Sequence, residues 1–189
     1  MSESDGRKKS YLNFSVPVTL KSVQQLFNII QNRLKRGTET FTILISSPGG
    51  QVASGVNAFN FLKGVPAKII THNIGQVDSI GVVIYCAGTK RYCSPNTRFL
   101  IHGIGFNAKE GQRFNEGLLA EKLEGLKNDR ITISKIISQN SKRSLKEIEA
   151  DMYKGVVWTP EQAINYGLVD EIRTELFEKG ADVEQVTVF

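Results

Sequence analysis

The stretch FTILISSPGG, from Phe41 to Gly50, joins a short apolar run to a glycine turn. The run from Phe41 to Ile45 is rich in residues that favour β-structure and is nearly continuous in hydrophobicity, which is typical of a strand covered on both faces. Apolar residues then recur at helical spacing from Val52 to Leu62. This order predicts a strand, a tight turn and a helix.

The same order recurs further along the chain. A second strand is expected from Ala67 to Thr71, ending at a glycine turn, and a second helix from Ser79 to Ala87. Strands that alternate with helices indicate βαβ units around a parallel sheet, so an α/β fold is expected. Chemistry in such sheets gathers at the carboxyl ends of the strands. The Gly49-Gly50 turn and Ser79 are therefore expected to meet, although 29 residues separate Gly50 from Ser79.

Other elements follow from local patterns. A helix is expected from Val23 to Leu34, and further strands from Arg91 to Ser94 and from Arg98 to His102. A long helical pattern then carries apolar residues from Phe114 to Ile137. That helix is longer than a compact core needs. Two interpretations stay open, an arm that packs against a neighbouring subunit and a surface helix of the same domain.

Two capping boxes predict helices in the last third of the chain. Ser144 is followed three residues later by Glu147, and Thr159 by Gln162 with proline at the first helical position. A final strand is expected from Leu168 to Ile172.

Composition predicts a single globular domain. The chain has 189 residues with a net charge of +5, and residues 1–10 are expected to form a mobile polar tail ahead of one domain over residues 11–189. The basic residues are scattered and are not gathered with aromatics, so no nucleic-acid partner is expected. No stretch approaches the roughly 18 apolar residues that span a bilayer. The N-terminus also lacks the apolar centre of a secretory signal, so a cytoplasmic protein without membrane contact is expected.

Cysteine and histidine usage gives no sign of a metal site or a cofactor. Cys86 and Cys93 lie outside any CxxC spacing and are expected to be buried free thiols in a reducing compartment. The two histidines are His72 and His102, and His72 is expected at the end of a strand. No metal and no cofactor are therefore expected.

Ser79 and His102 are the candidate catalytic pair. Ser79 is expected at the start of a helix, where the N–H of Ile80 and an N–H of the Gly49-Gly50 turn are suited to an oxyanion, and His102 follows a strand as a general base. Alone each signal is weak, because a serine at a helix start usually caps the helix and a strand-end histidine is more often structural. The context is also not the G-x-S-x-G elbow, because Val77 lies two residues before the serine.

Four runs in the same order strengthen this interpretation. Ile45 to Val52, Gly75 to Gly81, Pro95 to His102 and Tyr166 to Asp170 resemble the proteolytic subunit of the ATP-dependent Clp protease, over about residues 40–172. The resemblance implies the Clp peptidase/crotonase fold, in which stacked βαβ units carry a projecting helical handle.

The resemblance also implies an activity and partners. It implies a serine endopeptidase that hydrolyses unfolded proteins or peptides inside a homo-oligomeric ring, with Ser79 as nucleophile and His102 as base. The amides of Gly50 and Ile80 would form the oxyanion hole. An AAA+ unfoldase is the partner that the family implies, although the segment before Tyr11 is short and polar compared with the family segment that contacts the ATPase ring.

One family feature is missing from its expected place. The position of the family's triad aspartate is taken here by Gly155, and Asp151, four residues earlier, is the candidate replacement if the loop bends differently. Loss of the orienting acid lowers turnover by about four orders of magnitude in a serine-protease triad. Two alternatives to an active peptidase follow. One is a catalytically silent structural subunit that assembles with active homologues, and the other is acyl-CoA chemistry as in crotonases, whose sites usually use carboxylates.

Overall fold

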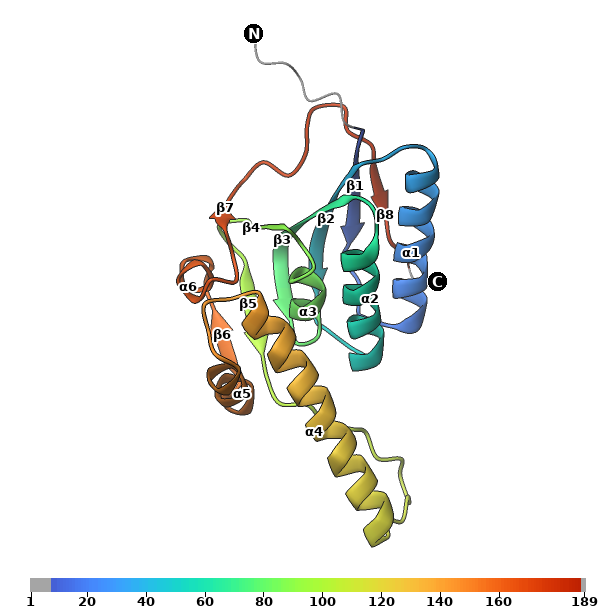
Figure 1. Ribbon diagram of the computed structural model, residues 1–189, viewed down its shortest axis with the longest axis vertical. Coiled ribbons are helices and arrows are strands. Elements are labelled where there is room, and N and C mark those ends of the chain that lie inside the picture. The colour runs from blue at the N-terminus through green and yellow to red at the C-terminus, as the bar shows by residue number, and fades with distance from the viewer. Residues whose placement is uncertain (1–7, 188–189) are drawn as a thin grey trace.

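The computed structural model describes residues 8–187 and contains one eight-stranded sheet with helices packed against it (Figure 1). The strands are β1 (Lys9–Phe14), β2 (Thr40–Ser47), β3 (Lys68–Asp78), β4 (Lys90–Cys93), β5 (Arg98–Ile101), β6 (Val156–Trp158), β7 (Glu171–Ile172) and β8 (Val183–Gln185). The helices are α1 (Leu20–Lys35), α2 (Val52–Gly64), α3 (Gly81–Tyr85), α4 (Glu116–Gln139), α5 (Leu145–Lys154) and α6 (Pro160–Tyr166).

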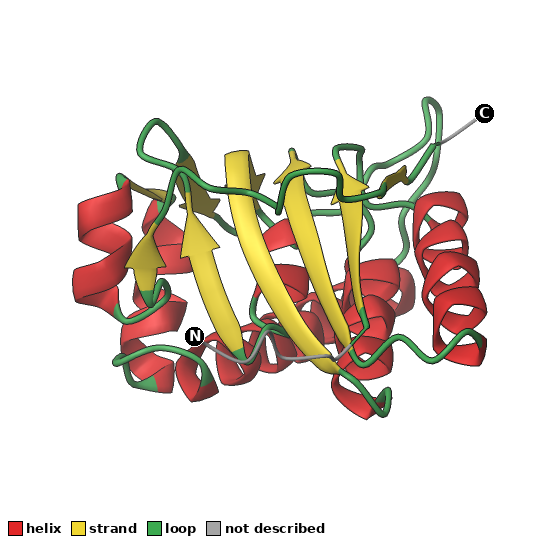
Figure 2. Cartoon of the chain, turned by 90° about the horizontal axis from the view of Figure 1, so that it is seen from above, coloured by secondary structure: helices red, strands yellow, loops and turns green. Residues whose placement is uncertain are grey.

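The sheet confirms the α/β prediction. Its main path runs β6-β5-β3-β2-β1-β8, while β4 pairs with both β3 and β7. All of these pairings are parallel except that between β5 and β6. Figure 2 shows the helices gathered beneath the strands, so one face of the sheet is covered by them. The strand expected from Phe41 to Ile45 forms as part of β2, but its second face is only partly covered, because Thr42 is half-buried whereas Leu44 on the same face is buried.

Strand β1 was not expected from the sequence. It begins at Lys9, inside the segment expected to be a tail, and pairs in parallel with β2. Ser10, Leu12 and Phe14 alternate into the core, whereas the residues between them are more exposed. Pairing with β2 and burial of one face stabilise this strand, and a short alternation of polar and apolar residues does not reveal either of them. Residues 1–7 of the expected tail lie outside the described residues.

Strand β3 continues through Gly75, which was expected to form a turn after the strand. Between Ile45 and Ser47 of β2, the paired position on β3 advances from Asn73 to Val77, so β3 carries two extra residues there. Such a bulge bends a strand and re-aims the residues that follow it. Gly75 lies in the bulge, and a Cβ at this position would come within 2.7 Å of the Ser46 Oγ. The expected turn is therefore a bulge inside one long strand.

The long helical pattern forms helix α4, which projects away from the sheet as the family resemblance implied (Figure 1). Near its C-terminal end, Ile133, Ile136 and Ile137 are buried in the core. Leu119 and Leu123, nearer its N-terminus, are about half exposed. Neither α4 nor any other helix in residues 8–187 is long and apolar enough to cross a membrane.

Both capping boxes form as predicted. The Ser144 and Thr159 side chains cap α5 and α6, each with the reciprocal hydrogen bond from the third helical residue. Helix α5 ends at Lys154 and is capped by Gly155, whose φ of +72° lies in the left-handed region that favours glycine. The strand expected from Leu168 is reduced to β7, because Leu168 and Val169 pack into the core before the pairing begins.

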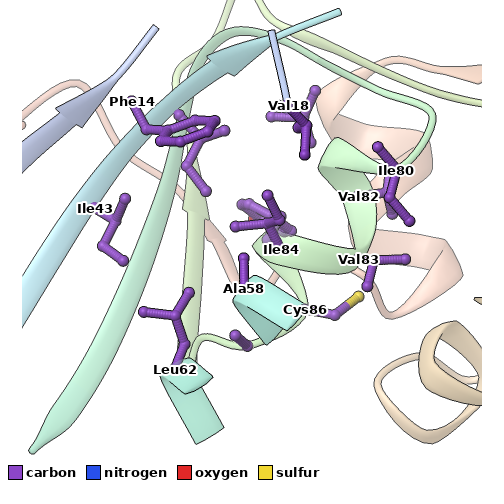
Figure 3. Packing of buried hydrophobic residues seen from close by; sticks show 14 of the residues in the cluster. Phe14, Val18, Ile43, Ala58, Leu62, Ile80, Val82, Val83, Ile84 and Cys86 are labelled. Carbon is purple, nitrogen blue, oxygen red and sulfur yellow. The ribbon is translucent and has the colours of Figure 1, made fainter. Parts of the chain in front are cut away.

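The core lies between the sheet and the helices beneath it. Figure 3 shows Phe14 and Ile43 of the strands facing Ile84 of α3 and the α2 residues Ala58 and Leu62. Burial of such side chains contributes about 1.5–3 kcal/mol each.

The two cysteines are also in this core. Cys86 and Cys93 are both free and buried, as predicted. Burial raises the pKa of the Cys86 thiol to about 12 and that of Cys93 to about 11, so both stay protonated at neutral pH.

Candidate active site

Ser79 lies at the junction between β3 and α3 in an unusual backbone conformation. Its φ is +57°, and it is the one non-glycine residue with positive φ in residues 8–187. Such a conformation costs about 1–3 kcal/mol and is enriched at functional sites. The Ser79 N–H donates to the carbonyl of Leu100 at 2.7 Å, which ties this sharp turn to β5. The chain thus makes an elbow at the serine without the G-x-S-x-G sequence.

A cavity of about 130 Å³ opens beside Ser79. Its walls come from five parts of the chain that are distant in sequence: the glycine turn, the elbow, the end of β5 with the loop after it, α4 and α5. The residues that line it are Gly50, Val52, Ser79, Ile80, Ile101, His102, Gly103, Ile104, Gly105, Ile133 and Met152. Ser79, His102, Gly50 and Ile80, which the sequence nominated, are all among them.

The glycine turn after β2 packs directly against the elbow. A Cβ on Gly49 would lie 2.6 Å from the Cβ of Ser79, and one on Gly50 would lie 2.2 Å from the carbonyl oxygen of Val18. Val18 holds the turn on its other side with two hydrogen bonds of 2.8 Å each. Its N–H donates to the carbonyl of Gly49, and its own carbonyl accepts from the N–H of Gln51. Only glycine permits these approaches and the positive φ values of +87° and +149° at Gly49 and Gly50.

The backbone N–H groups of Gly50 and Ile80, the two residues expected to form an oxyanion hole, line the cavity and have no acceptor among the residues that the structure describes. Ile80 is also the N-cap of α3, so its N–H lies at a helix start, where N–H groups lack intrahelical acceptors. Unpaired N–H groups that line a cavity are donors available to a negatively charged oxygen.

His102 follows the last residue of β5 and is exposed at the cavity. Its Nδ1 lies 2.7 Å from the carbonyl oxygen of Gly103. Because a carbonyl can only accept, Nδ1 carries the hydrogen in this contact and Nε2 is left with its lone pair. That tautomer is the one a general base needs. Sequence reasoning did not identify this role for Gly103, because it belongs to the backbone and carries no residue-specific signal.

Gly155 lies beside His102 with no carboxylate. Strands β5 and β6 are antiparallel with Ile101 opposite Val156, so the residue after β5 lies next to the residue before β6. A Cβ on Gly155 would lie 4.0 Å from the Cβ of His102. The position is therefore the one from which a side chain could reach the imidazole, and here that side chain is absent.

Asp151 has another partner. Its Oδ2 accepts a hydrogen bond from the Tyr166 hydroxyl at 2.7 Å, and Asp151 is not among the cavity-lining residues. Burial and this carboxylate together raise the pKa of Tyr166, so the hydroxyl remains a donor. Asp78, next to the serine, is bonded instead to Arg98 at 2.8 Å. Neither carboxylate is hydrogen-bonded to His102.

The apolar wall of the cavity was not predicted. Ile133 of α4 and Met152 of α5 reach it because the base of α4 packs against α5. In sequence these residues follow the ordinary helical periodicity of core residues, so no local signal separates them from their neighbours. In residues 8–187 there is no group of three or more His, Cys, Asp or Glu side chains placed to hold a metal ion.

Comparison with known proteins identifies relatives across most of the chain. A family model described as Clp protease matches residues 14–175. The ATP-dependent Clp protease proteolytic subunit 2 of Thermobifida fusca (strain YX) is 32% identical over 139 residues, which are 70% of this chain and 64% of that protein. The protein of the same name from Tropheryma whipplei (strain Twist) is 32% identical over 143 residues, 72% of this chain and 75% of that protein. The match thus spans less than two thirds of the T. fusca relative.

A solved structure has the same fold. A mutant ClpP1 from Listeria monocytogenes superposes with a TM-score of 0.77, covering 87% of this chain and 91% of that one at 23% sequence identity. The sheet with its projecting α4 is therefore the Clp peptidase fold that the sequence resemblance implied.

Proposed function

This chain belongs to the Clp protease family, and on that basis we propose that it is a serine-type endopeptidase that cleaves unfolded polypeptides or peptides. The observation that carries the proposal is the single cavity shared by Ser79, His102, Gly50 and Ile80. These groups supply a nucleophile, a base and two amide donors, which are the parts that acyl transfer needs.

The reaction follows from these positions. The Ser79 oxygen attacks the carbonyl carbon of the scissile peptide bond while His102 Nε2 takes its proton. The N–H groups of Gly50 and Ile80 stabilise the negative charge that develops on the carbonyl oxygen. His102 then gives its proton to the leaving amine, and water, activated by the same histidine, releases the acyl group from Ser79.

The Gly103 carbonyl performs part of the role of the triad aspartate, which is replaced here by Gly155. It accepts from His102 Nδ1 and so selects the tautomer with a basic Nε2. A neutral carbonyl stabilises the imidazolium that forms less than a carboxylate does, because charge-assisted hydrogen bonds are roughly twice as strong as neutral ones. Turnover is therefore expected to be slow for this family.

Labelling with a fluorophosphonate tests the proposal. The purified protein should react at Ser79, and both Ser79→Ala and His102→Ala should abolish labelling and peptide hydrolysis. Circular dichroism of each variant serves as the folding control. Equal hydrolysis by Ser79→Ala would rule the proposal out.

A second candidate function is a silent subunit that builds a ring with active homologues. The observation that favours it is Gly155 beside His102, because no carboxylate orients the imidazole. This candidate predicts no labelling of Ser79 alone or in any oligomer, together with stable co-assembly with a catalytically active family member. Mass spectrometry of the labelled complex distinguishes the two candidates.

Assembly into a ring is part of the proposal. The exposed apolar side chains of α4, among them Leu119 and Ile131, suit the interpretation of α4 as an arm that packs against a neighbouring copy. Leu119→Asp should then shift the protein to smaller species in analytical ultracentrifugation, and an unchanged sedimentation profile would favour the surface-helix interpretation. Polypeptides are the proposed substrates and an AAA+ unfoldase is the proposed partner, in the cytoplasm.

A further inference from the structure

A groove of about 510 Å³ continues from the catalytic cavity along α4 and α5. The two spaces share three wall residues, Gly103, Ile104 and Met152. A chain seated at Ser79 can therefore extend from the cavity into the groove without leaving the surface. An extended peptide advances about 3.3 Å per residue, so a few residues next to the scissile bond would occupy it.

The groove has an apolar floor and a cationic rim. Leu123, Leu126 and Ala150 line it, and Tyr153, which is 93% exposed, stands at its edge. An aromatic ring left this exposed has area available for contact with a peptide.

The charged side chains that line the groove are three cations and one carboxylate: Lys127, Arg130, Lys146 and Glu149. Arg130 is paired with Glu149 at 3.3 Å, and Lys127 with Glu124 at 3.6 Å. Lys146 has no ion-pair partner among residues 8–187. The groove thus presents one unbalanced positive charge and two more that are only partly neutralised.

The position of Lys146 is unfavourable for its own helix. It lies in the first turn of α5, where the helix dipole favours negative charge, as at the neighbouring Glu147. A lysine that is unfavourable for its own helix and has no ion-pair partner indicates a role other than stabilising the fold.

We propose that this groove is a substrate subsite that selects an acidic side chain, with Lys146 as the specificity-determining residue. The inference rests on the proposed peptidase function, because it places the acidic residue in the same peptide that Ser79 cleaves. The apolar floor holds the aliphatic part of a glutamate side chain, while Lys146 pairs with its carboxylate.

Internally quenched peptides test the inference. They share one apolar residue before the scissile bond and carry Glu, Gln or Lys at one neighbouring position, scanned over both sides of the bond. The Glu peptide should be cleaved with a kcat/KM about two- to fivefold above that of the Lys peptide, the range that exposed ion pairs give. Lys146→Glu should reverse this order, and salt near 1 M should remove it.

A matched control and a binding assay separate this inference from the proposed function. Lys63→Glu makes the same charge change on α2, outside the groove, and should leave the Glu-to-Lys ratio unchanged. Fluorescence anisotropy with Ser79→Ala measures binding of the same peptides without cleavage. Charge-selective binding that Lys146→Glu reverses supports the subsite even if the wild type cleaves nothing. Equal binding and equal cleavage of the Glu and Lys peptides would overturn it while the peptidase proposal stands.

Discussion

Gly155 and His102 are neighbours across the antiparallel pair of β5 and β6, with 4.0 Å between the histidine Cβ and a Cβ built on the glycine. This relationship predicts that Gly155→Asp raises turnover, because a carboxylate there can accept from His102 Nδ1 in place of the Gly103 carbonyl. The gain should be at least tenfold and at most about 10⁴-fold, the loss caused by removal of a triad acid. Peptide hydrolysis under saturating substrate measures it.

Gly155→Asn is the matched control for that variant. Both substitutions place a side chain at a φ of +72°, which should cost about 1 kcal/mol of stability. Only aspartate adds a negative charge that stabilises the imidazolium. Turnover of Gly155→Asp no higher than that of Gly155→Asn would contradict the prediction.

The close packing of the glycine turn makes a second prediction. Gly49→Ala should lower kcat/KM by about 10²-fold, because the added methyl lies 2.6 Å from the Ser79 Cβ and must displace the Ser79 side chain. Gly37→Ala is the control, since Gly37 has a similar φ of +82° but nothing within 4 Å of an added Cβ. It should lose about 1 kcal/mol of stability and no activity. Similar losses of activity in both variants would show that displacement of Ser79 is not the cause.

The bond between Tyr166 and Asp151 is expected to serve stability alone. Tyr166→Phe leaves a partly buried carboxylate without its donor and should lower the free energy of unfolding by about 1.5–3 kcal/mol, measured by urea denaturation. The rate of Ser79 labelling should stay within about twofold of the wild type, because neither residue lines the cavity. A large fall in labelling by a folded Tyr166→Phe or Asp151→Asn variant would instead return Asp151 to the catalytic site.

Burial of His72 predicts that the folded protein loses stability as the pH falls. His72 is buried, and burial lowers its pKa below the usual value of 6.5. Below that value the unfolded chain binds a proton that the folded chain does not, so stability is lost as the pH falls. His72→Gln removes the titration and keeps a side chain that can hydrogen-bond Ser94. The melting temperature should fall less between about pH 7.5 and 5.5 in this variant than in the wild type, and an equal fall would contradict the assignment.

Local signals predicted most of the fold. The strand, glycine turn and helix from Phe41 to Leu62 were predicted because each part has its own short-range pattern. Strand β1 was missed because its stability comes from pairing with β2. Gly75 was misinterpreted because a glycine in a bulge and a glycine in a turn are identical in sequence, and only the register against β2 distinguishes them.

The parts of the site that depend on a reactive side chain could be predicted from the sequence. Ser79 and His102 carry reactive side chains, the first at a predicted helix start and the second at a predicted strand end, and the structure brings them to one cavity. The Gly103 carbonyl could not be identified, because every residue has one. Asp151 was nominated by its distance along the chain, but its hydrogen bond to Tyr166 depends on how α5 packs against α6.

The 2.7 Å hydrogen bond from Ser79 N–H to Leu100 has a mechanical consequence. Leu100 lies in β5, two residues before His102, which directly follows that strand, so the proposed nucleophile Ser79 and the proposed base His102 are held by one pair of bonded strands. A movement that separates them must first break this bond and the pairing of β3 with β5. Control over reactivity is therefore expected to act through the parts around these two strands, such as the loop after His102 and the end of α5.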